Sequence, residues 1–383
     1  MGQDNRSLRA LVASSTQLTA AKVAERSAES GEHYITRDMA EYRAMVGKAV
    51  GGGALIGLTT WVKFALYGLA LSAFWTGFAA GLNYAFFFVL VQLLHLTVAT
   101  KQPAVTAPAM VAKLRDIRTP GAVLRFVDEV AHLLRSQFAA ILGNVGAVIP
   151  VVLLISLALQ QWLGAPMIDA EKAQHVLHDM HLLGPTALFA AFTGVLLFSS
   201  SIVAGWVENW FVFHKLDSAI AHNPRFTRVL GTPRAGRWAA WLRHNVSGLT
   251  ANISLGFMLG IVPVVLAFFG LDLEVRHVTL SAGQVAAAAA SLGWPVLHDP
   301  AFWWAVAGVV VVGPLNLAVS FYLAFRLALK AQAISDVNRH RINAALRLRL
   351  RRAPLSFFWP PRPQDNTSVD DDEPAASAGP PPH

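Results

Sequence analysis

Two charged residues fall inside stretches that are otherwise apolar, and they are the first candidates for chemistry. Lys63 lies within residues 54–74, and Glu208 lies about two turns from the end of residues 185–213. A charge inside a membrane costs at least a few kcal/mol unless it is paired or reaches water. We therefore expect Lys63 and Glu208 to pair in the interior of a helical bundle. Such a pair would fix how two helices pack, and in a second interpretation it would line a path for ions or protons.

Asparagines are the next polar residues inside apolar stretches. Four different stretches each contain one of them: Asn83, Asn144, Asn252 and Asn316. In a membrane, an asparagine side chain usually donates a hydrogen bond to a neighbouring helix, which is worth about 0.6–2 kcal/mol. We expect this packing role, and a polar cavity shared by the four side chains is the alternative.

Three histidines have residue types and spacing that could hold a metal ion. His175, His178 and His181 follow at three-residue intervals, with Asp179 beside them. On a helix this spacing spreads the rings over about 120°, so all three could approach one Zn²⁺. No second ligand set is evident, and the chain has no cysteine, which excludes thiolate ligands, disulfides and thiol catalysis. We expect no metal and no other cofactor, with this cluster as the weak alternative.

The composition of the chain is typical of a membrane protein. Of its 383 residues, 54% are hydrophobic and 14% are charged, whereas a soluble domain has about 25% charged residues. The apolar residues form blocks of roughly the 20 residues that a helix needs to cross a bilayer. We expect six spans, at residues 54–74, 78–99, 138–163, 185–213, 246–270 and 301–329. The predicted fold is an all-α, polytopic transmembrane helical bundle.

Lys and Arg residues alternate between the connectors of these spans. Their numbers from the N-terminal segment to the C-terminal one are seven, none, six, one, six, one and eight. Cytoplasmic loops carry the excess of Lys and Arg, so both termini are predicted to be cytoplasmic. We expect no cleaved signal peptide, because the first residues contain no apolar core of the required length.

Composition divides the chain into four predicted parts. They are a cytoplasmic helical lead-in (1–50), the six-span domain (51–330), a basic cytoplasmic helix (331–352) and a disordered, Pro-rich acidic tail (353–383). Three consecutive glycines at 51–53 are expected to form a hinge at the membrane surface. Residues 120–137 are expected to form a separate amphipathic surface helix, and the alanine-rich residues 281–291 to lie in the interface or dip into it.

The basic helix carries a cluster of arginines, namely Arg347, Arg349, Arg351 and Arg352. Basic segments next to a span usually contact anionic lipid headgroups, and we expect this partner for the cytoplasmic basic segments. No aromatic stacking platform accompanies the cluster, so nucleic acid is not expected as a partner.

Weak internal similarity suggests three related hairpins. Arg135 and Arg243 are each followed nine residues later by an asparagine, and then by a Pro-Val-Val-Leu string that begins at Pro150 or Pro263. Each hairpin would enter and leave on the cytoplasmic side. Chance similarity between apolar segments is the alternative.

Two strings carry a resemblance to a known family. GEHYITRDMAEYRAMVGKAVGGG (residues 31–53) and ATKQPAVTAPA (residues 99–109) resemble the bacterial family catalogued as site-specific recombinase, of the gonococcal crossover-recombinase type. The resemblance covers roughly residues 31–352, and the chain is similar to the membrane half of such proteins or to a short version. It implies a multi-pass body in the bacterial inner membrane and a DNA-rearrangement label, without catalytic residues that can be carried over.

The residues do not favour recombinase chemistry. A tyrosine recombinase gathers an Arg, a His-x-x-Arg pair and a nucleophilic Tyr around a DNA phosphate. His-x-x-Arg occurs at 132–135 and 222–225, and Tyr322 is the one tyrosine that follows them, inside a predicted span.

We therefore expect a multi-pass inner-membrane protein of this family, whose molecular role the sequence leaves open. One alternative is a transporter or channel for a small solute or ion that uses the interior Lys, Glu and Asn side chains. The other alternative is the DNA recombinase of the family label. The lipid bilayer is the expected partner, and a homo-oligomer is compatible with the sequence.

Overall fold

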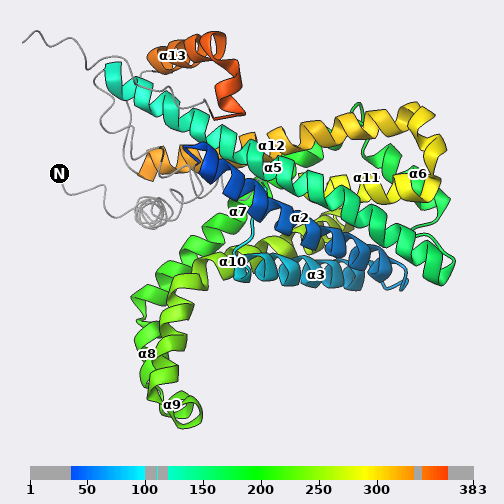
Figure 1. Ribbon diagram of the computed structural model, residues 1–383. Helices are drawn as coiled ribbons and strands as arrows, with labels where there is room; N and C mark the ends of the chain where they lie inside the picture. Colours follow the sequence, from blue (N-terminus) through cyan, green and yellow to red (C-terminus); the bar gives the residue numbers. More distant parts are fainter. Residues whose placement is uncertain (1–35, 100–109, 111–119, 332–338, 361–383) are drawn as a thin grey trace, which may run out of the picture.

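The structure is a computed structural model that describes residues 36–99, 110, 120–331 and 339–360. Within these residues the chain forms helices and no strands. Six of the helices are long and apolar enough to cross a membrane, and they lie together in one bundle (Figure 1). They are α2 (Met39–Tyr67), α3 (Ala73–Leu93), α5 (Pro120–Leu163), α7 (Thr186–Phe213), α10 (Thr232–Phe268) and α12 (Pro300–Ala331). The all-α prediction with six spans is confirmed.

Shorter helices lie at the two ends of this bundle (Figure 1). One end, called the α6 side below, carries α6 (Ala170–Asp179), α11 (Val278–Leu292) and η3 (Trp294–His298). The other end, the α13 side, carries α8 (Leu216–His222), α9 (Pro224–Leu230), α13 (Arg339–Arg352) and η4 (Pro354–Phe357). The expectations for residues 1–35, for most of the second connector and for residues 361–383 lie outside the described residues.

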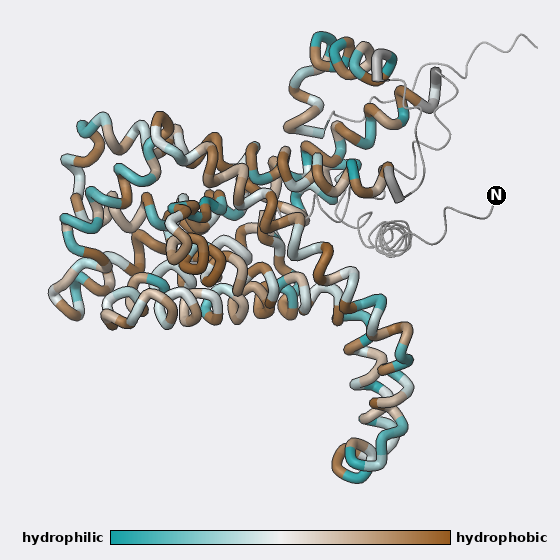
Figure 2. The backbone as a smooth tube through the Cα atoms, turned by 180° about the vertical axis from the view of Figure 1, so that it is seen from behind, coloured by the Kyte–Doolittle hydropathy of each residue, from teal (hydrophilic) through white to brown (hydrophobic). Residues whose placement is uncertain are grey.

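The bundle exposes an apolar surface, as a membrane protein must. Large side chains in the middle of spans, such as Phe86, Leu154 and Val310, are more than half exposed. Figure 2 shows apolar residues along the whole length of the bundle helices. In water this surface would exceed the apolar patches that soluble monomers tolerate, whereas lipid covers it without cost.

The first span begins earlier than the sequence predicted. Asp38 caps α2 by accepting a hydrogen bond from the Glu41 backbone N–H at 2.8 Å, and the Glu41 carboxylate accepts one from the Arg37 N–H at 2.6 Å. This reciprocal capping box starts the helix. α2 then continues to Tyr67, so the predicted lead-in helix and first span form a single helix.

The expected hinge at residues 51–53 is wrong, because α2 passes through the three glycines without a break. A Cβ atom at Gly52 would lie 2.1 Å from the Thr97 carbonyl oxygen, and one at Gly53 would lie 2.3 Å from the Asn144 carbonyl oxygen. Both neighbours are backbone atoms, so a larger residue would separate the segments. The glycines therefore allow close packing rather than bending.

The separate surface helix at residues 120–137 is also a wrong expectation. It is the first part of α5, which runs without interruption for 44 residues. Arg135, which a surface helix would expose to water, is fully buried. Its Nε and Nη2 donate to the Ser356 carbonyl at 3.1 and 2.7 Å, and its Nη1 donates to the Arg37 carbonyl at 3.3 Å. Arg135 thus fastens η4 and the start of α2 to the bundle.

α11 is a re-entrant helix. At 15 residues it is about 22 Å long, too short to cross a bilayer, yet ten of its residues are buried. The segment before it, residues 269–277, enters the bundle from the α6 side, and α11 returns to that side while packing on α5, α6 and α12. Non-helical backbone at this depth requires protein partners for its polar groups.

Two asparagines supply these partners in equivalent ways. Each side chain donates to one carbonyl of a neighbouring span, and it also binds the C=O of residue n and the N–H of residue n+2 in an extended segment. For Asn144 these groups are the carbonyls of Ala49 and Thr97 and the N–H of Ala99, at 2.6, 2.9 and 2.6 Å. For Asn316 they are the carbonyls of Ala190 and Arg276 and the N–H of Val278, at 2.8, 2.9 and 3.2 Å.

This equivalence divides the bundle into two halves. The first contains α2, α3, the extended residues 97–99 and α5, and the second contains α7, α10, the extended residues 276–277, α11 and α12. The most extensive contacts within the halves are α2 with α5 and α7 with α12. Because α5 and α12 run in opposite directions (Figure 1), the two halves are inverted with respect to each other. The three hairpins expected from the sequence are not the packing units.

α3 and α10 join the two halves through glycines. Gly77 and Gly81 on α3 face Gly256 and Gly260 on α10, each pair with a spacing of four. A Cβ atom at Gly260 would lie 2.3 Å from the Gly81 nitrogen and 2.4 Å from the Gly77 oxygen. The two backbones are therefore in direct contact, as small-residue motifs in membrane helices permit.

Candidate functional site

A cavity of about 960 Å³ lies between α2, α3, α6, α10 and α11 in the α6-side part of the bundle. One wall, from α3 and α10, is mainly apolar: Phe74, Ala80, Leu259, Val264 and Phe268. The other wall, from α6 and the extended segment before α11 (residues 269–277), is mainly charged: Lys172, Asp179, Asp272, Glu274 and Arg276. The cavity is thus amphipathic across its width.

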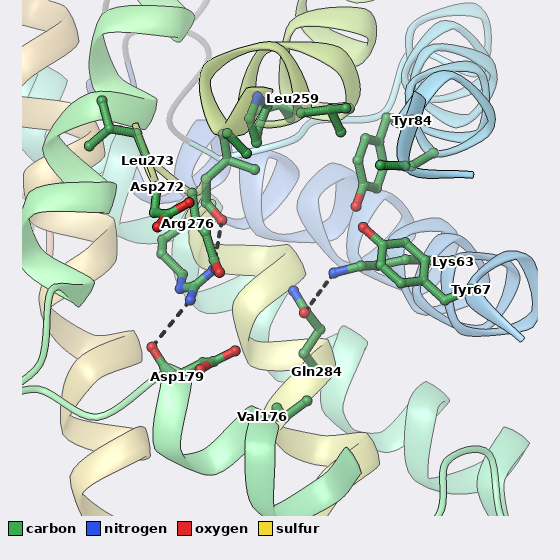
Figure 3. Close-up of a pocket in the computed structure, with 18 of the residues that line it drawn as sticks. Lys63, Tyr67, Tyr84, Val176, Asp179, Leu259, Asp272, Leu273, Arg276 and Gln284 are labelled. Atoms are coloured by element: carbon green, nitrogen blue, oxygen red, sulfur yellow. Dashed lines mark hydrogen bonds and ion pairs between the residues drawn. The ribbon is translucent and has the colours of Figure 1, made fainter. Parts of the chain in front are cut away.

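Lys63 lies where the two walls meet. Its ammonium donates to the Gln284 side-chain oxygen at 2.7 Å, and Figure 3 shows it beside Tyr67 and Tyr84. The ammonium also lies 5.4 Å from the centre of the Tyr67 ring and 5.8 Å from that of Phe64. Among the described residues Lys63 forms no ion pair. A cation with spare N–H donors therefore faces the cavity, and among the described residues no carboxylate lies within 4 Å of it.

The expected pair of Lys63 and Glu208 does not form. Lys63 lies four residues before the end of α2 at Tyr67, next to the α6 side, whereas Glu208 lies five residues before the end of α7, towards the α13 side. These helix ends are at opposite ends of the bundle (Figure 1). The prediction failed because α2 ends at Tyr67, seven residues before the predicted end of the span, which places Lys63 near one surface instead of at mid-depth.

Arg276, the single basic residue of its connector, is buried and lines the cavity. The sequence alone did not predict it in the interior of the bundle. Its guanidinium pairs with Glu274, donates to the Asp179 carbonyl at 3.3 Å and lies 5.4 Å from the Phe189 ring. Its backbone N–H donates to Thr193 Oγ1 at 2.7 Å. Arg276 therefore holds the extended segment against α6 and α7.

One signal in the sequence pointed to these residues. Lys172 and Arg276 are the single basic residues of their connectors, and both line the cavity together with Lys63. The carboxylates of Asp179 and Glu274, the amide of Gln284 and the two tyrosines gave no such signal, because their proximity arises only in the folded bundle.

The four interior asparagines make packing contacts and do not line the cavity. Besides Asn144 and Asn316, Asn83 donates to the Thr59 carbonyl at 3.0 Å, and Asn252 donates to the Gln92 side-chain oxygen at 2.5 Å. The Asn252 contact ties α3 to α10 on the α13 side of the cavity. Gly248 lies beside it, since a Cβ atom there would be 2.6 Å from Gln92 Nε2.

The three histidines do not converge on one point. His175 and His178 both approach Asp179, at 3.4 and 3.9 Å, whereas His181 stacks on Trp304 with ring centres 5.3 Å apart. No group of three or more His, Cys, Asp or Glu residues in the described part of the chain could hold a metal ion.

The basic cluster on α13 is divided between two roles. Arg349 pairs with Asp128 of α5 and donates to Ser356 Oγ at 3.2 Å, so it holds α13 against the bundle. Arg347, Arg351 and Arg352 are exposed.

The recombinase residues are not gathered into a site. Arg135 is buried and bound to backbone carbonyls, so its guanidinium is not available to a phosphate. Arg225 lies on α9, which packs on α8 and α10, whereas Tyr322 lies on α12, which packs mainly on α7 and α11. The Tyr322 ring is exposed on the apolar surface of the bundle, with Arg326 5.9 Å from its centre.

Comparison with known proteins gives one match. No curated protein and no solved structure matches the chain. The family described as "Site-specific recombinase" matches residues 1–360, which is nearly the whole chain and more than the region of resemblance noted from the sequence. The chain therefore belongs to the site-specific recombinase family.

Proposed function

We propose that this protein binds a small anionic amphiphile in the cavity and carries it across the membrane. The observation on which the proposal rests is the Lys63 ammonium, which faces the cavity with Gln284 as its hydrogen-bond partner and no ion pair among the described residues. A charged side chain within a membrane span that lacks an ion-pair partner marks a functional site by default. An anionic group of the solute would supply the missing charge.

The walls of the cavity support an amphiphile rather than a simple ion. Phe74, Leu259 and Phe268 offer an apolar surface opposite the charged wall. A small solute with an anionic group and an apolar part would place the first at Lys63 and the second against α3 and α10. Sites of this kind combine an apolar lining with a few polar groups that fix the orientation of the ligand.

The inverted halves support transport rather than binding alone. Many secondary transporters consist of two inverted repeats with broken or re-entrant helices, and they alternate by moving one repeat against the other. Here the cavity lies beside the α3–α10 contact, since Ala80 and Gly260 line it, and the Gln92–Asn252 contact lies farther towards the α13 side. We infer that separation of α3 and α10 at the Gln92–Asn252 contact opens the path to the α13 side.

We further infer that the membrane is a bacterial inner membrane and that the α13 side faces the cytoplasm. The connectors on that side contain most of the Lys and Arg residues, which is the pattern of cytoplasmic loops. Because the cavity lies in the α6-side part of the bundle, the solute in the present conformation enters from the face opposite the cytoplasm.

Benzenesulfonate is a suitable probe, because it is a small aromatic anion whose charge does not change with pH. We expect it to raise the melting temperature of the full chain in nanodiscs, while benzyl alcohol and phenyltrimethylammonium do not. A ligand at a hundred times its Kd stabilises the folded state by about 2.7 kcal/mol. The Lys63→Met variant should lose the benzenesulfonate shift and Lys63→Arg should retain part of it.

Lys215→Met is the matched control, because it removes the same charge from an exposed position on the α13 side. Uptake of labelled benzenesulfonate into proteoliposomes then separates transport from binding. The proposal is wrong if Lys63→Met and Lys215→Met respond to benzenesulfonate as the unaltered chain does.

A further inference from the structure

A helical arm leaves the bundle on the α13 side. It consists of α8, α9 and residues 232–244 of α10, and we call these segments the arm. Figure 1 shows it running away from the bundle, across the direction of the spans rather than along it. The joint between α7 and α8 lies at Lys215, whose φ of 49° is in the left-handed region and turns the chain sharply.

The arm holds itself together without a core of large side chains. α8 and α9 have no buried residues, and small residues of α10, Ala235 and Ala239, are buried where the helices meet. An ion pair between Asp217 and Arg243, at 3.2 Å, connects α8 to α10. Several large apolar side chains of the arm therefore find little cover within the arm itself.

These large apolar side chains are exposed. Val229 is 81% exposed and Trp238 is 57% exposed. Phe226 and Trp241 are exposed as well, and Phe213 is exposed at the joint. A group of this kind on a thin helical pair indicates contact with another apolar phase or molecule. Figure 2 shows apolar and polar residues alternating along the arm.

Basic residues lie beside the exposed tryptophans of α10. Residues 214–244 contain six Lys and Arg residues against one acidic residue, Asp217. Arg234, Arg237, Trp238 and Trp241 are at positions i, i+3, i+4 and i+7, which place them on one face of α10. A helix with tryptophan and arginine on one face is typical of the boundary between lipid headgroups and acyl chains.

We propose that the arm lies on the surface of the bilayer that the bundle spans and binds anionic lipid headgroups there. Both ends of the arm continue directly into spans α7 and α10, so the arm emerges at the level of the headgroups. Because it runs across the direction of the spans, its length follows the plane of the membrane. Its tryptophans and Val229 enter the interface, and its arginines meet phosphate groups.

The absence of native cysteine allows a direct measurement. A nitroxide is attached to Val229→Cys in the full chain, in nanodiscs of phosphatidylcholine alone or with 30% phosphatidylglycerol. Power saturation then compares the accessibility of the label to oxygen, which partitions into lipid, and to a water-soluble nickel chelate. We expect the label to favour oxygen, more so with phosphatidylglycerol.

Arg234→Gln with Arg237→Gln is the test variant. Each basic residue near an anionic surface strengthens binding about fivefold, so the two changes should lower the ratio of bound to free arm about thirtyfold. The label should then move towards water. Arg347→Gln with Arg351→Gln, exposed on α13, removes the same charge elsewhere and should leave the label at position 229 in place. Size-exclusion profiles confirm that both variants remain folded.

Three results would overturn the proposal. The first is a label that stays accessible to the nickel chelate in both lipids. The second is dipolar broadening between labels, which would place a second copy of the chain against the arm. The third is protection of the label by added duplex DNA in nanodiscs of phosphatidylcholine alone, which would assign the arm to nucleic acid.

Discussion

The replacement of Asn316 by leucine tests the inverted architecture most directly. The Asn316 side chain binds two carbonyls and the N–H of Val278, all inside the bundle. Hydrogen bonds between membrane helices average about 0.6 kcal/mol each, and a buried N–H left without a partner costs about 1–3 kcal/mol. Val278 is the first residue of α11, so no other residue of that helix accepts its N–H. We expect Asn316→Leu to lower the free energy of unfolding by about 2–4 kcal/mol.

Asn83→Leu is the matched control. Asn83 is also buried inside a span, but its side chain donates a single hydrogen bond among the described residues, to the Thr59 carbonyl, which belongs to a regular helix. Its loss should therefore cost about 0.6 kcal/mol. Unfolding in mixtures of dodecyl maltoside and sodium dodecyl sulfate, followed by tryptophan fluorescence, gives both values.

Hydrogen exchange adds a local measurement to the same variants. Amides at the start of α11 should exchange faster in Asn316→Leu than in Asn83→Leu, because only the first change releases the extended segment. Equal losses of stability in the two variants, with unchanged exchange at Val278, would refute the role assigned to Asn316.

Two further predictions concern packing and orientation. Gly260→Ala places a Cβ atom 2.3 Å from the Gly81 nitrogen and should cost about 1–3 kcal/mol of stability, whereas Gly146→Ala meets nothing within 4 Å and should be neutral or slightly stabilising. Equal unfolding midpoints for the two variants would contradict the close contact of α3 and α10. For orientation, Ser72→Cys and Lys215→Cys should react with an impermeant maleimide from opposite sides of a sealed vesicle. Reaction of both from one side would show that the assignment of sides is wrong.

Much of the fold was predictable because it depends on local properties. The span predicted at 185–213 is α7 (Thr186–Phe213) and the one predicted at 301–329 lies within α12 (Pro300–Ala331). Hydropathy and length act on each segment separately, so they can be evaluated without knowledge of its neighbours. The sequence also separated the basic connectors from the others, and the basic ones share the α13 side of the bundle.

The predictions from sequence were wrong where the role of a residue depends on the segments that pack against it. Three glycines in a row fit a hinge as well as a close contact, and only the position of residues 97–99 beside α2 decides between them. Arg135 fitted the polar face of a surface helix, yet the Ser356 carbonyl, 221 residues away, receives its N–H groups inside the structure. A contact between residues so far apart in the chain leaves no periodic pattern in either segment, so the sequence of one segment cannot reveal it.

Local properties of the chain were sufficient to predict six segments long and apolar enough to cross a membrane and the connectors in which basic residues gather, since the cost of placing apolar or charged side chains in a given solvent belongs to each segment alone. Three features are visible only in the packed bundle: α11 turns back, two inverted halves meet at glycines, and Lys63 faces a cavity beside Gln284. These features arise from contacts between segments far apart in the chain, and their energies exist only once the helices have packed.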